Sequence, residues 1–234
     1  MVVNYERSGA AAIVTIDRPE RRNAVDGPTA AALLEAYERF AADEDARVMV
    51  LTGAGEDAFC AGADLKALET LNPDAPAGPM GFTRLTPVKP GIAAIRGWCV
   101  AGGLELALWC DLRVASDDAR FGCLVRRWGV PLIDGGTQRL PRVVGLGRAL
   151  DLILTGREVD AAEALAMGLV NELVPDPLAR ALELAEAIAA FPQDTMLSDR
   201  EATIAAGGLE LEARLGRERI ATALQGAQRF RVRP

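Results

Sequence analysis

Two acidic residues stand where the chain could transfer protons. Glu105 follows the glycine pair at 102–103, where an apolar strand pattern gives way to a helical one. Glycines at such a junction let the backbone approach a ligand closely, with N–H groups at the positive end of the helix dipole. A carboxylate one turn into that helix is suited to act as a general acid or base. The purely structural interpretation is a glycine cap followed by a solvated glutamate.

The second acidic candidate, Asp134, stands immediately before the glycine pair at 135–136 in an apolar neighbourhood. Apolar surroundings would raise the pKa of its carboxyl and let it act as an acid. The purely structural interpretation is that Asp134 caps a helix starting at Gly135.

A second junction rich in small residues follows the apolar run at 47–52. Residues 58–66 form a loop that we expect to turn into a helix near Asp64, again with free N–H groups at its start. If Ala63 and Gly102 face each other, their amides form an oxyanion hole for a thioester oxygen. Losing one such donor typically costs about 3–4 kcal/mol of activation free energy.

The composition removes several kinds of chemistry. The chain has no histidine, which excludes Ser-His-Asp and Cys-His catalysis and histidine-based zinc sites. Its four cysteines form no C-x-x-C pair, and their apolar or small neighbours indicate core residues. The net charge of −7 argues against nucleic acid or an anionic membrane as the main partner. No dinucleotide or nucleotide phosphate-loop motif is present.

Hydrophobic periodicity predicts the elements that must position these residues. Strands followed by helices indicate an α/β fold with a mainly parallel sheet and repeated strand–strand–helix units. Residues 72–90 hold five prolines, which predicts an irregular or mobile loop of the kind that often shapes a substrate site. We expect strands at 2–7, 11–16, 47–52, 91–95, 112–115, 119–122 and 169–174, and helices from Asp26, from about Gly102, at 145–155, at 160–166 and from Asp176 to about Ala190, with two more helices in the last 40 residues.

With 234 residues and 50% hydrophobic content, the chain can bury one sizeable core with a helical appendage. There is no run of 18 apolar residues, and the N-terminus lacks the pattern of a signal peptide. We therefore expect a soluble, cytoplasmic protein.

Four motifs, at 59–66, 97–107, 135–141 and 162–171, closely resemble the enoyl-CoA hydratase/isomerase (crotonase) superfamily, in the family's order and spacing from about residue 2 to residue 225. The resemblance implies a crotonase-like spiral of β-β-α units over residues 1–175, which holds an acyl-CoA site. It implies a helical region over residues 176–234 for trimerisation or cover, and a homotrimer or a dimer of trimers. No cofactor or metal is implied beyond the coenzyme A of the thioester substrate.

The resemblance also assigns roles to residues. The thioester oxygen would be held by the amides of Ala63 and Gly102. The substrate and coenzyme A contacts would fall on Arg22, Ala24, Ala61, Ala63, Asp64, Leu65, Lys66 and Gly102.

The pattern of acids departs from that of true hydratases. Glu105 matches the first of two catalytic glutamates, but the position of the second, 20 residues later, is Val125. Valine cannot act as an acid or base, so Asp134 is the substitute carboxylate. It lies close to where dienoyl-CoA isomerases and aryl-CoA dehalogenases carry a catalytic aspartate.

The sequence thus predicts a hydratase-type lyase that adds water to 2-enoyl-CoA, with Glu105 and Asp134 sharing proton transfer. A double-bond isomerase would tolerate Val125 better, because one base can shuttle one proton. The residues are also compatible with a hydrolase or dehalogenase that uses Asp134 as nucleophile, and with a non-catalytic acyl-CoA-binding subunit. A role in nucleic-acid binding is disfavoured by the acidic charge balance.

Overall fold

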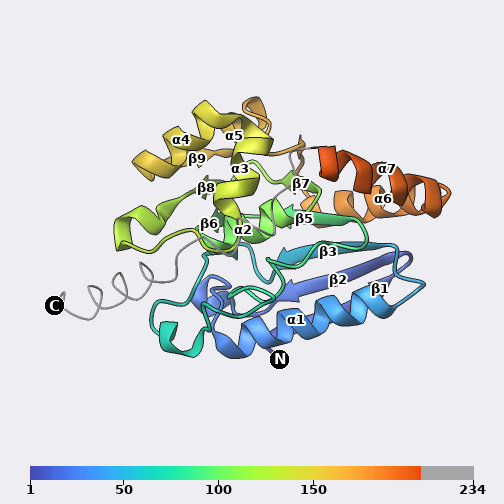
Figure 1. Cartoon of the computed structure of the whole chain (residues 1–234), viewed down its shortest axis with the longest axis horizontal. Coiled ribbons are helices and arrows are strands. Elements are labelled where there is room, and N and C mark those ends of the chain that lie inside the picture. The colour runs from blue at the N-terminus through green and yellow to red at the C-terminus, as the bar shows by residue number, and fades with distance from the viewer. Residues whose placement is uncertain (207–234) are drawn as a thin grey trace.

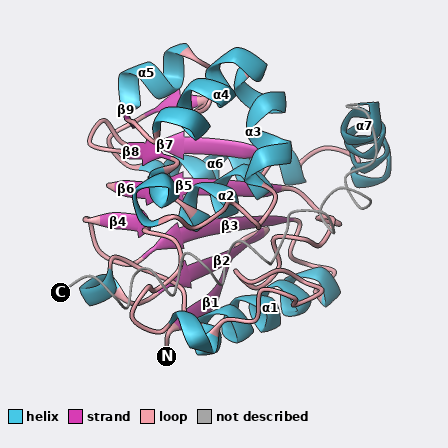
Figure 2. Cartoon of the chain, turned by 60° about the vertical axis from the view of Figure 1, so that its left-hand side comes forward, coloured by secondary structure: helices cyan, strands magenta, loops and turns pink. Residues whose placement is uncertain are grey.

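A computed structural model describes residues 1–206 of the chain, whose strands form two sheets (Figures 1 and 2). The larger sheet has the order β1-β2-β3-β5-β7-β10, and the smaller one has the order β4-β6-β8-β9. The strands are β1 (Val3–Ser8), β2 (Ala11–Ile16), β3 (Val48–Gly53), β4 (Ala58–Cys60), β5 (Gly91–Ile95), β6 (Trp98–Val100), β7 (Leu112–Ala115), β8 (Arg120–Gly122), β9 (Glu158–Asp160) and β10 (Glu172–Leu173).

Helices connect and cover the sheets. Figure 1 shows α1 along the β1 side of the molecule, α3, α4 and α5 at the opposite side, and α6 beside α7. The α-helices are α1 (Gly27–Ala42), α2 (Gly102–Trp109), α3 (Gly136–Val144), α4 (Leu146–Thr155), α5 (Ala161–Ala166), α6 (Pro177–Ala189) and α7 (Gln193–Ala206), and the 3-10 turns are η1 (Pro19–Arg21), η2 (Leu68–Thr70) and η3 (Leu124–Trp128).

From β3 to β8, consecutive strands alternate between the two sheets, and this alternation produces the spiral. β3, β5 and β7 pair in parallel in the larger sheet, while β4, β6 and β8, each following one of them, pair in parallel in the smaller sheet. Each strand pair leads into a helical segment: η2 after β4, α2 after β6, and η3 then α3 after β8. The predicted crotonase-like repeat of β-β-α units is therefore confirmed.

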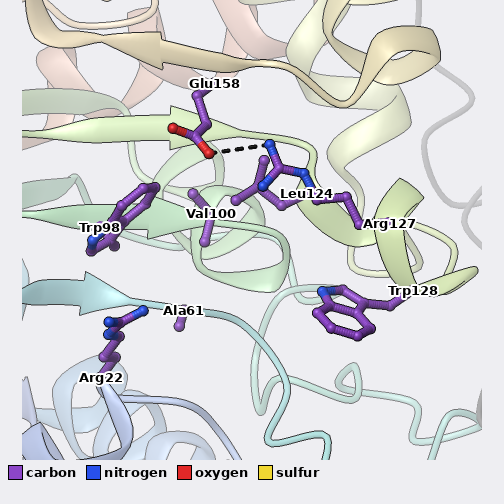
Figure 3. A pocket seen from close by; sticks show the side chains of 8 residues that line it. All are labelled: Arg22, Ala61, Trp98, Val100, Leu124, Arg127, Trp128 and Glu158. Carbon is purple, nitrogen blue, oxygen red and sulfur yellow. Dashed lines mark hydrogen bonds and ion pairs between the residues drawn. The ribbon is translucent and has the colours of Figure 1, made fainter. Parts of the chain in front are cut away.

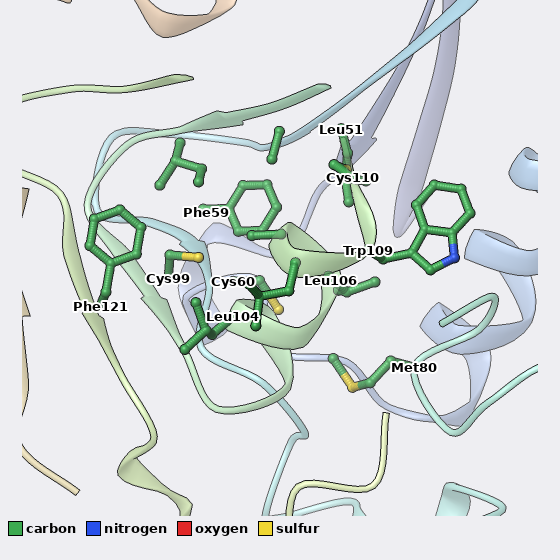
Figure 4. Close-up of a cluster of buried hydrophobic side chains, with 14 of the residues drawn as sticks. Leu51, Phe59, Cys60, Met80, Cys99, Leu104, Leu106, Trp109, Cys110 and Phe121 are labelled. Carbon is green, nitrogen blue, oxygen red and sulfur yellow. The ribbon is translucent and has the colours of Figure 1, made fainter. Parts of the chain in front are cut away.

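The central strand β3 is buried on both faces, as its continuous apolar run predicts. Val48 and Val50 pack in one cluster with residues of α6, whose N-terminal Asp176 caps the helix by accepting the Ala179 amide. Met49 and Leu51 face the main core on the other side, which also encloses α2. Figure 4 shows side chains of this core around α2. The helix bearing Glu105 is therefore held on all sides by packed residues.

The helix expected near Asp64 is absent. Residues 61–67 run as an irregular segment, and the chain forms only the single 3-10 turn η2, from Leu68. The reason is pairing: the amide of Asp64 donates to the carbonyl of Val25 at 2.8 Å, in an isolated bridge that holds this stretch extended. A backbone held in this way cannot wind into a helix.

Besides the 3-10 turns, four short elements were not expected from the sequence. β4, β6 and β9 have three residues each, too few to show a period of two, and α3 replaces part of a segment whose glycines and Pro141 indicated turns. The strand expected at 169–174 is reduced to β10, since the amide of Leu169 bonds back to the carbonyl of Ala164. The other predicted elements agree with the structure to within one or two residues.

The loop at 72–90 is irregular, as expected, but it is packed firmly into the core. Met80, Phe82 and Thr83 are fully buried. The Phe82 ring packs between Tyr37 and Trp109, with ring centroids 5.5 and 4.6 Å apart.

The four cysteines are buried free thiols, which confirms their prediction as core residues. Burial raises the pKa of Cys60, Cys110 and Cys123 to about 12, so these groups are not thiolates near neutrality. No helix within residues 1–206 is both long and apolar enough to cross a bilayer. The second helix expected in the last 40 residues lies outside the described residues.

Candidate active site

The N-terminus of α2 is formed by a sharp turn at the end of β6. Ala101 adopts φ 55° and ψ −128°, a conformation that a side chain disfavours by about 1–3 kcal/mol. This one residue converts the strand into the helix. The amide of Gly102, the first residue of α2, has no acceptor within the helix and points outward with the helix dipole behind it.

The chain next to Ala63 passes close to the start of α2. In the bridge between Val25 and Ala63, Val25 bonds to Gly62 and to Asp64, so the Ala63 amide points to the opposite side. A Cβ built at Gly62 would lie 2.8 Å from the Gly102 nitrogen. Gly62, the residue before Ala63, therefore lies against the N-terminus of α2, as two convergent oxyanion donors would require.

Glu105 is buried one turn into α2, with 2% of its surface exposed. Its Oε1 accepts the amides of Asp134, at 2.9 Å, and of Gly136, at 2.8 Å. A Cβ at Gly136 would lie 2.8 Å from Cγ of Glu105, so only glycine fits there. The carboxylate is therefore fixed in place rather than solvated.

The Asp134 carboxyl is buried as well, 3% exposed, and faces the 72–90 loop. Its Oδ1 accepts the Met80 amide at 3.0 Å and the Thr83 hydroxyl. Asp134 does not cap α3, where Gly135 is the capping residue and no side chain bonds to the helix. Burial raises the pKa of the Asp134 carboxyl, while its hydrogen bonds and the charges of Arg84 and Arg139 act in the opposite direction.

Glu105 and Asp134 thus come together, as the sequence led us to expect. The Asp134 amide donates to Glu105, so the two residues share one network. Val125, where true hydratases have their second glutamate, is an apolar residue of η3 that is only 7% exposed.

The loop with Arg22 and Ala24 joins the same edge of the smaller sheet. The Arg22 carbonyl accepts the Ala61 amide at 3.0 Å. Between Arg22 and Ala24, the fully buried Asn23 donates to the carbonyls of Ala54 and Ala58, at 2.9 and 2.6 Å. Asn23 therefore fixes the position of two of the expected coenzyme A contacts.

The side chain of Asp64 is engaged with the protein itself. It forms an ion pair with Arg18 at 3.0 Å, and Arg18 also pairs with Asp26 at 3.0 Å. Leu65 is half-buried and Lys66 is exposed. Of this segment, Lys66 is the residue whose charged side chain reaches solvent.

A surface pocket of about 240 Å³ opens next to these residues (Figure 3). Two tryptophans stand at its two sides, with Ala61 between them in the view. Arg127 pairs with Glu158 at its rim, at 3.1 Å. The pocket is lined by Arg22, Ala61, Trp98, Val100, Leu124, Arg127, Trp128 and Glu158.

Sequence reasoning missed Met80 and Thr83, which complete the surroundings of Asp134. Neither belongs to a periodic pattern. The available signal was the pair Gly78 and Gly81, both of which adopt positive φ, 107° and 103°, in the tight turns that bring Met80 to Asp134. No group of three or more potential metal ligands occurs among residues 1–206.

The spiral of β-β-α units, with the buried carboxylate of Glu105 in the helix after β6, is the fold of the crotonase superfamily. The family model for enoyl-CoA hydratase/isomerase matches residues 6–219. The chain therefore belongs to the enoyl-CoA hydratase/isomerase family.

Individual relatives support this family assignment. The chain is 40% identical over 223 residues to (E)-benzylidenesuccinyl-CoA hydratase of Thauera aromatica, covering 91% of this chain and 86% of the relative. It is 41% identical to the short-chain-enoyl-CoA hydratase of Clostridium acetobutylicum over 74% of this chain and 68% of that one. The crystal structure of carnitinyl-CoA hydratase from Mycobacterium avium superposes with a TM-score of 0.86 at 35% identity, covering 96% and 90%.

Proposed function

We propose that this protein is an enoyl-CoA hydratase, a lyase that adds water to a 2-enoyl-CoA thioester. The proposal is supported by one arrangement: the chain beside Ala63 lies against the start of α2 at Gly102, and the carboxylate of Glu105 is fixed one turn further along that helix. Relatives at 40% identity and above carry the name of this activity. Those relatives act on different acyl groups by name, so the acyl group is a separate question.

In the proposed reaction, the two amides bind the thioester oxygen and stabilise the enolate that forms when the double bond is attacked. Glu105 takes a proton from water as the water oxygen bonds to C3. Asp134, whose carboxyl pKa is raised by burial, gives a proton to C2 from its protonated form. Glu105 then releases its proton to solvent and Asp134 takes one up from solvent, which restores both groups.

The coenzyme A portion is proposed to lie along the loop of Arg22 and Ala24 and the segment from Ala61 to Lys66. Arg22 and Lys66 are exposed cations suited to phosphate groups. Asp64 is proposed to act through its ion pair with Arg18, which holds the two segments together. No cofactor beyond the coenzyme A of the substrate is proposed.

We also propose a homotrimer or a dimer of trimers, with residues 176–234 as its helical cover. The proposal follows the family resemblance. It is supported by leucines 146, 150 and 154, which are exposed along one face of α4 by 66, 43 and 74%. We further propose that the protein acts in the cytoplasm and binds neither membrane nor nucleic acid.

The test is product identity. The purified full-length protein is incubated with trans-2-enoyl-CoA and, separately, with 3-enoyl-CoA, and the products are followed by mass spectrometry. Hydration adds one water to the 2-enoyl substrate, whereas isomerisation moves the double bond with no change in mass. Isomerisation of 3-enoyl-CoA without hydration would replace the proposal by the isomerase reading that Val125 favours. Binding of both thioesters without turnover would indicate a non-catalytic subunit.

A further inference from the structure

The two oxygens of the Asp134 carboxyl have different surroundings. Oδ1 accepts two hydrogen bonds, from the Met80 amide and the Thr83 hydroxyl. No residue of the described part of the chain donates a hydrogen bond to Oδ2. A proton on Oδ1 would displace one of the two donors, so protonation is favoured on Oδ2.

The carboxylate of Glu105 is held in a similar way. One of its oxygens, Oε1, accepts two amides, those of Asp134 and Gly136. Both carboxyl groups of the site are therefore oriented by a pair of donors on one oxygen. The donors to Glu105 are backbone groups, whereas one donor to Asp134 is the side chain of Thr83.

Thr83 is itself rigidly held. It is fully buried, and its carbonyl accepts Nη2 of Arg139 at 2.6 Å. The same guanidinium donates through Nη1 to the Asp134 carbonyl at 2.8 Å. The next residue, Arg84, donates to the carbonyl of Ile133 at 3.1 Å. These hydrogen bonds fix the backbone at Thr83 and at Asp134, and so they hold the Thr83 hydroxyl against the Asp134 carboxyl.

We propose that Thr83 is a positioning residue for hydration: with the Met80 amide it occupies Oδ1 of Asp134 and so makes Oδ2 the oxygen that carries the transferred proton. This inference rests on the function proposed above. The Oδ2–H bond breaks as the C2–H bond forms, and the electron pair of the broken bond stays on Oδ2. The resulting carboxylate keeps both hydrogen bonds at Oδ1.

Several charged or titratable groups face Asp134. They come from the loop (Arg84), from α3 (Arg139), from β4 (Cys60) and from α2 (Glu105). Burial raises the pKa of the Asp134 carboxyl. The hydrogen bond from Thr83 favours the ionised carboxyl and therefore acts to lower this pKa. Removal of the hydroxyl therefore raises the pKa of Asp134, while the other groups stay in place.

The test compares Thr83→Val with Thr83→Ser in the full-length protein. Valine keeps the volume but removes the donor, whereas serine keeps the donor. We expect Thr83→Val to lower kcat roughly 10-fold with little change in KM. One limb of the pH profile of kcat should disappear in Asp134→Asn. This limb should lie at higher pH in Thr83→Val than in the wild type, and at the wild-type pH in Thr83→Ser. Thr155→Val, which removes a hydroxyl at the end of α4, is the matched control.

A second readout does not need turnover. Carbon-13 NMR of aspartate-labelled protein follows the Asp134 carboxyl, assigned by its loss in Asp134→Asn. The same rise of pKa is expected in Thr83→Val, and Thr83→Cys, which keeps a weaker donor of similar size, should give a smaller one. If Thr83→Val stays active and neither the Asp134 titration nor the pH limb changes, the role of Thr83 is overturned and the proposed function is not. A wild-type protein that hydrates no enoyl-CoA would instead overturn the proposed function.

Discussion

The carboxylate of Glu105 depends on the absence of a side chain at Gly136. Its Oε1 and Cγ lie 2.9 and 2.8 Å from where a Cβ at position 136 would stand. Gly136→Ala should therefore displace Glu105. We expect kcat to fall roughly 10- to 100-fold, since small misplacements of a reacting group can have effects of that size, and the free energy of unfolding to fall by about 1–3 kcal/mol. Steady-state kinetics and urea denaturation measure the two effects.

Gly147→Ala is the matched control for this change. Gly147 lies near the start of α4, and no atom lies within 4 Å of a Cβ built there. Because alanine is a better helix former, this variant should gain about 0.5–1 kcal/mol of stability and keep its activity. Equal losses of activity in both variants would argue against a specific contact between position 136 and Glu105.

Burial of Asp134 makes stability depend on pH. Its folded pKa is raised above 3.8, so the native state binds more protons than the unfolded state between these two pKa values. The free energy of unfolding therefore decreases as the pH rises through this window, where the buried carboxyl must ionise. Asp134→Asn keeps an oxygen acceptor for Met80 and Thr83 but removes this ionisation.

Chemical denaturation between pH 4 and pH 8 compares the wild type with Asp134→Asn. We expect the asparagine variant to lose less stability than the wild type as the pH rises. Parallel pH dependences in the two proteins would mean that Asp134 does not ionise within this window.

At the scale of elements, the loop at 72–90 is a fixed wall of the site. Arg84 donates to the carbonyls of Pro73 and Ala75, both at 3.1 Å, and also to Ile133. Arg84→Met should lower stability by about 1.5–3 kcal/mol. It should also speed hydrogen exchange across residues 73–84 and lower kcat/KM, because Met80 and Thr83 would lose their fixed positions.

Arg157→Met serves as the control for the loss of an arginine. Arg157 pairs with Asp151 and Glu163 at the surface, an arrangement that contributes about 0–1 kcal/mol. Hydrogen exchange of the 73–84 loop should be unchanged in this variant. If Arg84→Met left the loop equally protected, the loop would be held by its buried side chains instead.

The sequence predicted those elements whose own residues show a hydrophobic period or a helix cap. β3, α1 and α6 have long apolar patterns and cap residues, and they appear where expected. The extended stretch at 61–67 could not be predicted, because its conformation is set by pairing with Val25, distant in the sequence. Propensity describes only local preferences, and here a long-range contact decides.

The candidate site, too, could be predicted only in part. Glu105 and Gly102 follow from a local motif, and the resemblance supplied Ala63. That Asp134 faces Thr83, 51 residues earlier, depends on how an irregular loop folds back over α3. No spacing in the sequence encodes that contact.

For the whole molecule, the smaller sheet places the carboxyl ends of β4 and β6 side by side, which brings Gly62 against Gly102. The helix α4, which carries the exposed leucines, lies on the side of the molecule with α3 and α5 (Figure 1). We expect light scattering after gel filtration to give three or six times the 24.8 kDa of one chain. A mass of one chain at micromolar concentration would contradict the proposed trimer.

The most direct test of hydration follows the loss of enone absorbance of crotonyl-CoA and a medium-chain trans-2-enoyl-CoA with the wild type and Glu105→Gln. Glu172→Gln, which changes an exposed glutamate paired with Arg180, is the control. We predict hydration by the wild type and the control, and a fall in kcat of roughly 100- to 10,000-fold in Glu105→Gln, since the lost group is the general base. Hydration that persists in Glu105→Gln, or its absence in a wild type that binds acyl-CoA, would contradict the proposed chemistry.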